Sequence, residues 1–174
     1  MSVFPFDEPD VEKSKKNTEN LLEKHEDIQN MAISYSDTDI NNMISENKTN
    51  KVLYINLYLK ETKKINDSLN KLKEKLYLSY GINTVTGFGP RYLHSIGQLQ
   101  KGGSKDVWSI FFYDESLISH YIEKNNYKDL SDIFKAQMLG DFNALKELEI
   151  NAYLVNIDSN KPNPFDEIMD AIKE

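Results

Sequence analysis

One segment of the chain concentrates the residue types from which a binding or catalytic site is built. Residues 87–103 read GFGPRYLHSIGQLQKGG and hold most of the seven glycines, the single arginine Arg91, and His94, one of three histidines. Glycine lets a backbone approach a ligand closely or take up positive φ. An imidazole titrates near neutral pH and can transfer protons, and a guanidinium binds anions. The segment therefore predicts a loop that binds an anionic ligand and moves a proton.

Each of these residues has both a functional and a structural interpretation. His94 is the candidate general acid or base, and the alternative is a loop histidine bonded by neighbouring backbone. The remaining candidates would contact the ligand: Arg91, Ser95, Gln98, Lys101 and Gly89. The alternative for Arg91 and Lys101 is that they are solvated surface cations. Ser95 and Gln98 would instead hold the loop in place, and Gly89 would only make a turn. The glycine spacing does not match a dinucleotide-binding fingerprint.

Other titratable residues are weaker candidates. Glu61 and Glu115 could shuttle a proton, but each is placed where a helix or turn would begin. His25 and His120 have no partner at metal-ligand spacing, so the sequence predicts no metal site.

The sequence around this segment alternates between strand and helix patterns, and these elements must position it. Apolar, β-rich runs predict strands at residues 52–59, 83–86, 107–113 and 152–157. Three- and four-residue spacing predicts helices at 9–25, 38–46, 60–80, 130–149 and 164–173, with a break between two helices at Gly140-Asp141. The pattern predicts a single three-layer α/β domain, with a mostly parallel sheet flanked by helices. Residues 1–50 would form a helical segment that packs on the sheet of a 51–174 core, with Trp108, Phe111 and Phe112 buried inside.

Composition narrows the functional classes. The 174 residues carry a net charge of −7, which argues against nucleic-acid binding, and the chain has no cysteine. No apolar run approaches the length needed to span a bilayer, and the N-terminus lacks the pattern of a signal peptide. We therefore expect a cytoplasmic protein without a membrane partner.

Four stretches resemble one family. The segment at 87–103 resembles the signature GYGPRFLHSTGQLHKGG of the isomerase portion of bacterial transaldolase/glucose-6-phosphate isomerase fusion proteins. Residues 4–12 (FPFDEPDVE) resemble the family's NPFDQPDVE, residues 52–59 (VLYINLYL) its YVALLAYL strand, and residues 136–145 (AQMLGDFNAL) its AQALGDLAAL helix. The resemblance covers the chain from about residue 4 to residue 157.

The resemblance implies a sugar-isomerase-like fold and interconversion of glucose 6-phosphate and fructose 6-phosphate without a cofactor. In such isomerases a histidine opens the sugar ring, and this role would fall on His94. The family's catalytic glutamate lies in an ESTGK-like motif upstream of the stretch that matches residues 4–12, and this sequence does not contain it. Gln100 and Ile96 replace a histidine and a threonine of the signature. The resemblance therefore predicts no turnover by this chain alone.

Three interpretations remain open at this point, and the third is a structural remnant that only holds together by its own core. In the first, the chain supplies the ring-opening histidine to a sugar-phosphate site that a second chain completes with the remaining isomerase subdomains. In the second, the chain is a non-catalytic sugar-phosphate-binding or regulatory module.

Overall fold

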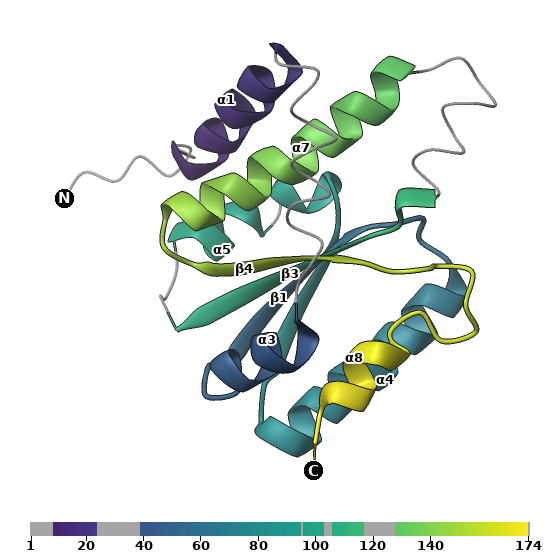
Figure 1. Ribbon diagram of the computed structural model, residues 1–174. Coiled ribbons are helices and arrows are strands. Elements are labelled where there is room, and N and C mark those ends of the chain that lie inside the picture. The colour runs from purple at the N-terminus through teal and green to yellow at the C-terminus, as the bar shows by residue number, and fades with distance from the viewer. Residues whose placement is uncertain (1–8, 24–38, 95, 103–105, 117–127, 174) are drawn as a thin grey trace.

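The computed structural model describes residues 9–23, 39–94, 96–102, 106–116 and 128–173. It confirms a three-layer α/β fold in which helices cover both faces of a four-stranded sheet (Figure 1). The strands are β1 (Val52–Tyr58), β2 (Asn83–Phe88), β3 (Val107–Tyr113) and β4 (Asn151–Asn156). Their order is β2-β1-β3-β4, and every neighbouring pair is parallel. All four strands therefore end at the same edge of the sheet.

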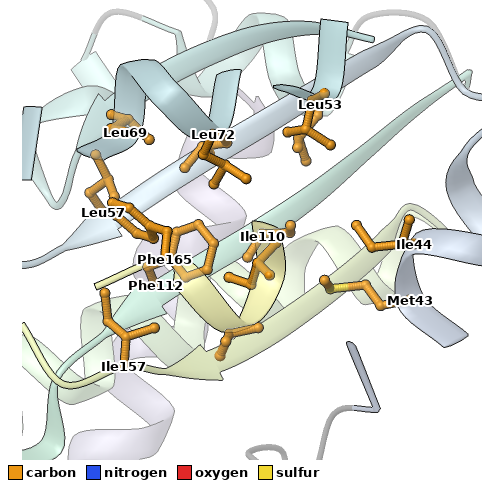
Figure 2. Close-up of a cluster of buried hydrophobic side chains, with 14 of the residues drawn as sticks. Met43, Ile44, Leu53, Leu57, Leu69, Leu72, Ile110, Phe112, Ile157 and Phe165 are labelled. Atoms are coloured by element: carbon orange, nitrogen blue, oxygen red, sulfur yellow. The ribbon is translucent and has the colours of Figure 1, made fainter. Parts of the chain in front are cut away.

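Three helices cover one face of the sheet. They are α3 (Ile40–Asn47), α4 (Lys63–Tyr80) and α8 (Asp166–Ala171). The Thr62 side chain caps α4 by accepting a hydrogen bond from the backbone N–H of Ile65, and α4 ends at Gly81 as predicted. Figure 2 shows the apolar cluster that these helices form with the sheet, which includes Met43, Ile44, Leu53, Leu57, Leu69, Leu72, Ile110, Phe112, Ile157 and Phe165. The α4 stripe of isoleucine and leucine predicted from the sequence is buried, whereas Tyr77 is 58% exposed.

The opposite face is covered by α7 (Lys128–Glu147), the short helix α5 (Gly97–Gly102) and the 3-10 turn η1 (Arg91–His94). Helix α1 (Pro9–Glu23) lies alongside α7 and also contacts α5 (Figure 1). This second apolar cluster includes Tyr58, Phe111, Leu139, Phe142 and Leu154. Trp108, Phe111 and Phe112 are all fully buried, as predicted. The division of the chain at residue 50 stays a prediction.

The sequence suggested that the glycine-rich segment is one loop, but the structure shows that it is not. Its first two residues continue β2 beyond the predicted end at residue 86, and η1 and α5 follow. The backbone N–H of Ile96 donates to the carbonyl of Tyr92, and the N–H of Gln100 donates to the carbonyl of Ile96. Hydrogen bonds between turns therefore replace the open loop that the glycine content indicated.

The predicted break at Gly140 is wrong, because α7 runs through it without interruption. Gly140 is the point where α1 and α7 touch. A Cβ atom added there would lie 2.4 Å from the Thr18 Oγ1 atom and 2.8 Å from the Thr18 backbone nitrogen. The glycine is needed for close helix packing rather than for a helix end.

Among the residues described above, no helix combines the length and the apolar character that crossing a bilayer requires.

Substituting Gly140→Ala tests the contact between α1 and α7. The added methyl group would push α1 away from α7, because the obstacles include the Thr18 backbone. We expect a loss of about 1–3 kcal/mol in the free energy of unfolding, as for other overpacked sites. Alanine's better helix propensity, worth up to about 1 kcal/mol, would reduce this loss. Urea denaturation measures it, and Lys146→Ala, at an exposed position of the same helix, is the control. Unchanged or increased stability of Gly140→Ala would contradict the close contact.

Candidate functional site

The carboxyl edge of the sheet brings together polar residues from all four strand ends. Glu61 follows β1, Arg91 follows β2, Asp114 follows β3 and Asp158 follows β4. Open α/β sheets bind their ligands outside the carboxyl ends of the strands, beside the point where the strand order reverses. Here that point lies between β1 and β3, at the centre of the sheet. This edge is therefore the candidate functional site.

Arg91 and Glu61 form an ion pair at this edge. The Arg91 Nη2 atom lies 2.9 Å from the Glu61 Oε2 atom, and the side chains are 73% and 49% exposed. An exposed pair of this kind contributes less than about 1 kcal/mol. The Arg91 guanidinium can therefore exchange the carboxylate for another anion at little cost.

The structure gives the other predicted residues of this segment different surroundings. The backbone of His94 belongs to η1 and that of Gln98 to α5, but their side chains lie outside the described part of the structure, as does all of Ser95. Gly89 precedes Pro90 in a cis peptide bond. A Cβ atom at Gly89 would lie 2.5 Å from the Tyr58 ring, so this position has no room for a side chain. His25 and His120 also lie outside the described residues.

Lys101 is in the interior rather than at the edge. Its ammonium group contacts the Asp141 carboxylate of α7, and both side chains are fully buried. Its neighbour Gln100 donates from Nε2 to the Ser109 Oγ atom of β3 at 2.7 Å. These two contacts attach α5 to α7 and to the sheet. The ligand-binding role predicted for Lys101 would require its ion pair to open.

Burial controls the protonation of Asp141. The loss of water raises the pKa of its carboxyl group to about 8, and a 3.1 Å hydrogen bond from Ser14 lowers it by a smaller amount. The ammonium of Lys101 favours the charged carboxylate, so the two surroundings of Asp141 compete, and burial is the larger effect. Burial also raises the pKa of the Tyr58 hydroxyl, and the nearby Asp141 raises it further.

The interior next to this pair contains further polar atoms. Asn56 is fully buried in β1, and within the described residues neither its amide nitrogen nor its amide oxygen has a hydrogen-bond partner. The same holds, within that part of the chain, for the Tyr58 hydroxyl and the Gln100 Oε1 atom. A buried polar group without a partner costs about 1–3 kcal/mol. These atoms therefore lower the stability of the fold.

A cavity of about 230 Å³ opens at the carboxyl edge of the sheet, beyond the ends of β3 and β4 and away from the Arg91–Glu61 pair. Its polar lining is mainly acidic: Asp114, Asp158 and Glu167, with Lys161, Ser116 and Asn156. Lys161 pairs with Glu167 at 2.9 Å, and Glu167 raises the pKa of the Lys161 ammonium. Asp114 accepts hydrogen bonds from the backbone N–H groups of Ser116 and Ser159 and so links the two loops. The remaining negative charge disfavours a phosphate inside this cavity.

Sequence reasoning missed Asn56, Asp114 and Asp141. Asn56 is the only polar side chain inside the apolar run of β1, and Asp114 directly follows the apolar run of β3. Both positions were visible signals, because a polar residue within or directly after a buried strand needs a partner or a function. Asp141 gave no such signal, because it lies beside Gly140 in what looked like a helix break.

Comparisons with known proteins support the fold and leave the chemistry open. No protein-family model matches the chain, and no curated protein matches it in sequence. The chain is similar to the crystal structure of a hypothetical protein from Thermus thermophilus, with a TM-score of 0.54 and 16% sequence identity. The similarity covers 76% of this chain and 36% of that one. At this identity, it concerns the fold alone.

The Lys101–Asp141 pair can be tested by removing one partner and then both. Above about pH 8, where Asp141 is charged, Lys101→Met leaves a buried carboxylate without its cation, which should lower the free energy of unfolding by up to about 3–5 kcal/mol. The double variant Lys101→Met/Asp141→Leu should recover most of that loss, because neither charge then remains buried. Urea denaturation of the three proteins measures both effects. Equal losses in the single and double variants would show that the pair is not coupled.

The raised pKa of Asp141 predicts a pH dependence. The unfolded carboxyl group loses its proton near pH 4, whereas the folded one keeps it up to about pH 8. Its stabilising contribution is therefore complete below pH 4 and is lost as the pH rises through 8. Relative to Lys101→Met/Asp141→Leu, the free energy of unfolding of the native chain should fall as the pH rises through this window. If the free energies of unfolding of the two proteins change with pH in parallel, the pKa of Asp141 is not raised.

Proposed function

We propose that this chain binds a sugar phosphate at the carboxyl edge of its sheet and opens the sugar ring with His94, in an aldose–ketose isomerase site that another chain completes. One observation carries the proposal. The segment that resembles the isomerase signature begins at the carboxyl end of β2, beside the central strand β1. Parallel α/β sheets of this kind bind ligands at that end of the strands.

Ring opening needs only one group that accepts and donates protons. The imidazole of His94 would accept the proton of the anomeric hydroxyl and return a proton to the ring oxygen. The bond between C1 and the ring oxygen breaks, and the open-chain aldehyde forms. Histidine suits both steps because its pKa lies near neutral pH.

The phosphate would bind Arg91. Its guanidinium is exposed at the same edge and is engaged only in the weak pair with Glu61, as far as the described residues extend. A phosphate dianion offers a guanidinium stronger, charge-assisted hydrogen bonds than a carboxylate does. Binding would therefore displace Glu61 from Arg91.

Isomerisation needs a further base, to move a proton between C1 and C2 of the open sugar. The two carboxylates considered for this role both have cationic partners: Glu61 pairs with Arg91, and Glu115 lies 2.5 Å from Lys135. For this reason the proposal assigns the base to the second chain.

The same two ion pairs favour a second candidate function, a module that binds a sugar phosphate without turnover. In that case Arg91 would still bind the phosphate, but His94 would transfer no proton. Binding and ring opening must therefore be measured separately.

Anomerisation of glucose 6-phosphate separates the two functions, because ring opening interconverts the α and β anomers without moving a proton between carbons. We expect the chain alone to accelerate this exchange, measured by proton NMR, without producing fructose 6-phosphate. His94→Asn should lower the rate roughly a hundredfold or more, the usual contribution of general acid–base catalysis. Binding without any acceleration would support the non-catalytic module.

Calorimetric titration with fructose 6-phosphate tests binding, with fructose and inorganic phosphate as comparison ligands. Arg91→Gln should raise the Kd for fructose 6-phosphate roughly tenfold to a hundredfold, because a hydrogen bond to a charged group contributes about 1.5–3 kcal/mol. Lys161→Gln, at the acidic cavity, is the matched control and should leave the Kd unchanged. Absence of heat with every ligand would contradict both functions.

A further inference from the structure

Strand β2 has an unpaired edge. The backbone N–H groups of Asn83 and Gly89 donate to carbonyls of the β1 side, at Lys51 (2.8 Å) and Leu57 (2.9 Å). Because backbone groups alternate in direction along a strand, the N–H and C=O groups of residues 84, 86 and 88 point away from β1. Within the described part of the chain, these outward groups have no hydrogen-bond partner.

The opposite edge of the sheet is different. The hydrogen bond from the Ile157 N–H to the Tyr113 carbonyl places the backbone groups of Leu154 on the outer side of β4, and Leu154 takes part in a further interaction. Farther along, the Asn156 side chain accepts a hydrogen bond from the backbone N–H of Glu115. Residues of the β4 edge therefore take part in interactions beyond strand pairing, whereas within the described residues the outward groups of β2 do not.

The β2 edge also lacks the features that prevent an exposed strand from pairing with a strand of another molecule. Proteins commonly protect such edges with lysine, proline or a bulge. The β2 sequence, NTVTGF, contains no charge and no proline, and its pairing with β1 is regular throughout. Exposed apolar side chains lie on the helices directly before and after it: Tyr77 and Leu78 on α4, and Leu99 on α5.

We propose that β2 pairs antiparallel with the β2 strand of a second copy of this chain, about a two-fold axis at Thr86, and that the two sheets become continuous. The register follows from the outward groups. With Thr86 opposite its own copy, Thr84 lies opposite Phe88, and all three outward residues of each strand form hydrogen-bonded pairs. A two-fold axis at residue 85 or 87 would leave one of the three unpaired.

The strand favours its own copy as the partner. A two-fold interface sets the same surface against itself, so any charge on it would face a like charge. The β2 edge has none, although the whole chain carries a net charge of −7. Antiparallel pairing also places Phe88 against the methyl group of Thr84 on the same face of the sheet, an aromatic–β-branched contact that stabilises strand pairs. This inference does not depend on the proposed function.

A single introduced cysteine tests the register, because the chain has no cysteine of its own. In the proposed dimer the two copies of residue 86 form a hydrogen-bonded pair with a Cα separation of about 5.5 Å, within the range of a disulfide. Thr86→Cys should therefore give a disulfide-linked dimer under mild oxidation. Thr84→Cys is the matched control, since its two copies would be roughly 14 Å apart, and it should remain unlinked. Equal linking of both variants, or of neither, overturns the proposal.

Sedimentation equilibrium tests association directly. The native chain should pass from monomer to dimer between low micromolar and millimolar concentrations. Thr86→Lys places two ammonium groups opposite each other and should leave the monomer at every concentration, while circular dichroism confirms its fold. Thr49→Lys makes the same change in an exposed turn and should dimerise like the native chain. A native chain that stays monomeric, or one that dimerises only with a different protein, refutes self-pairing.

Discussion

The two central strands of this protein, β1 and β3, are buried on both faces, and this constraint determines the rest of the structure. β3 is buried along its whole length and β1 along nearly all of it, so each face needs a helical layer. On one face α4 supplies most of that layer. On the other face α7 shares the task with η1 and α5, and Tyr92 of η1 belongs to the apolar cluster. The glycine-rich segment therefore contributes to the core as well as to the candidate site.

A helix as short as α5 needs specific contacts to hold its orientation. Apolar packing alone would tolerate several rotations of so few residues. Gln100 and Lys101 limit this freedom, because each contacts a polar group in the interior, Ser109 and Asp141 respectively. Such contacts bury charge and leave some polar atoms without partners, which lowers stability. They hold α5 against β3 and α7, and the hydrogen bond from the Ile96 N–H to the Tyr92 carbonyl links this part of the chain to η1, the turn that contains His94.

The sequence predicted the strands and longer helices well, because their signals are local. The stripe of Ile65, Leu69 and Leu72 identified α4, and uninterrupted apolar runs identified β1 and β3. The errors came from glycine and from long-range pairs. Gly140 was interpreted as a helix break, but its role depends on Thr18, which lies far away in the sequence. The ligand-binding role of Lys101 stays a prediction, but nothing in its sequence neighbourhood indicated the ion pair with Asp141. At the candidate site, Arg91 was found because it is the single arginine, whereas its partner Glu61 becomes apparent only when β1 and β2 lie side by side.

The geometry of the sheet separates the two surfaces that we assign. Pairing β2 with its own copy makes the two strands antiparallel, so the carboxyl edges of the two sheets face opposite directions. A second copy bound at β2 therefore cannot bring its own Glu61 or Glu115 to the first copy's Arg91. If an isomerase base is supplied from outside, it must come from a chain that approaches the carboxyl edge. The two surfaces use different groups of the chain, because self-association uses the backbone of β2 along the side of the sheet while the site uses side chains beyond the strand ends.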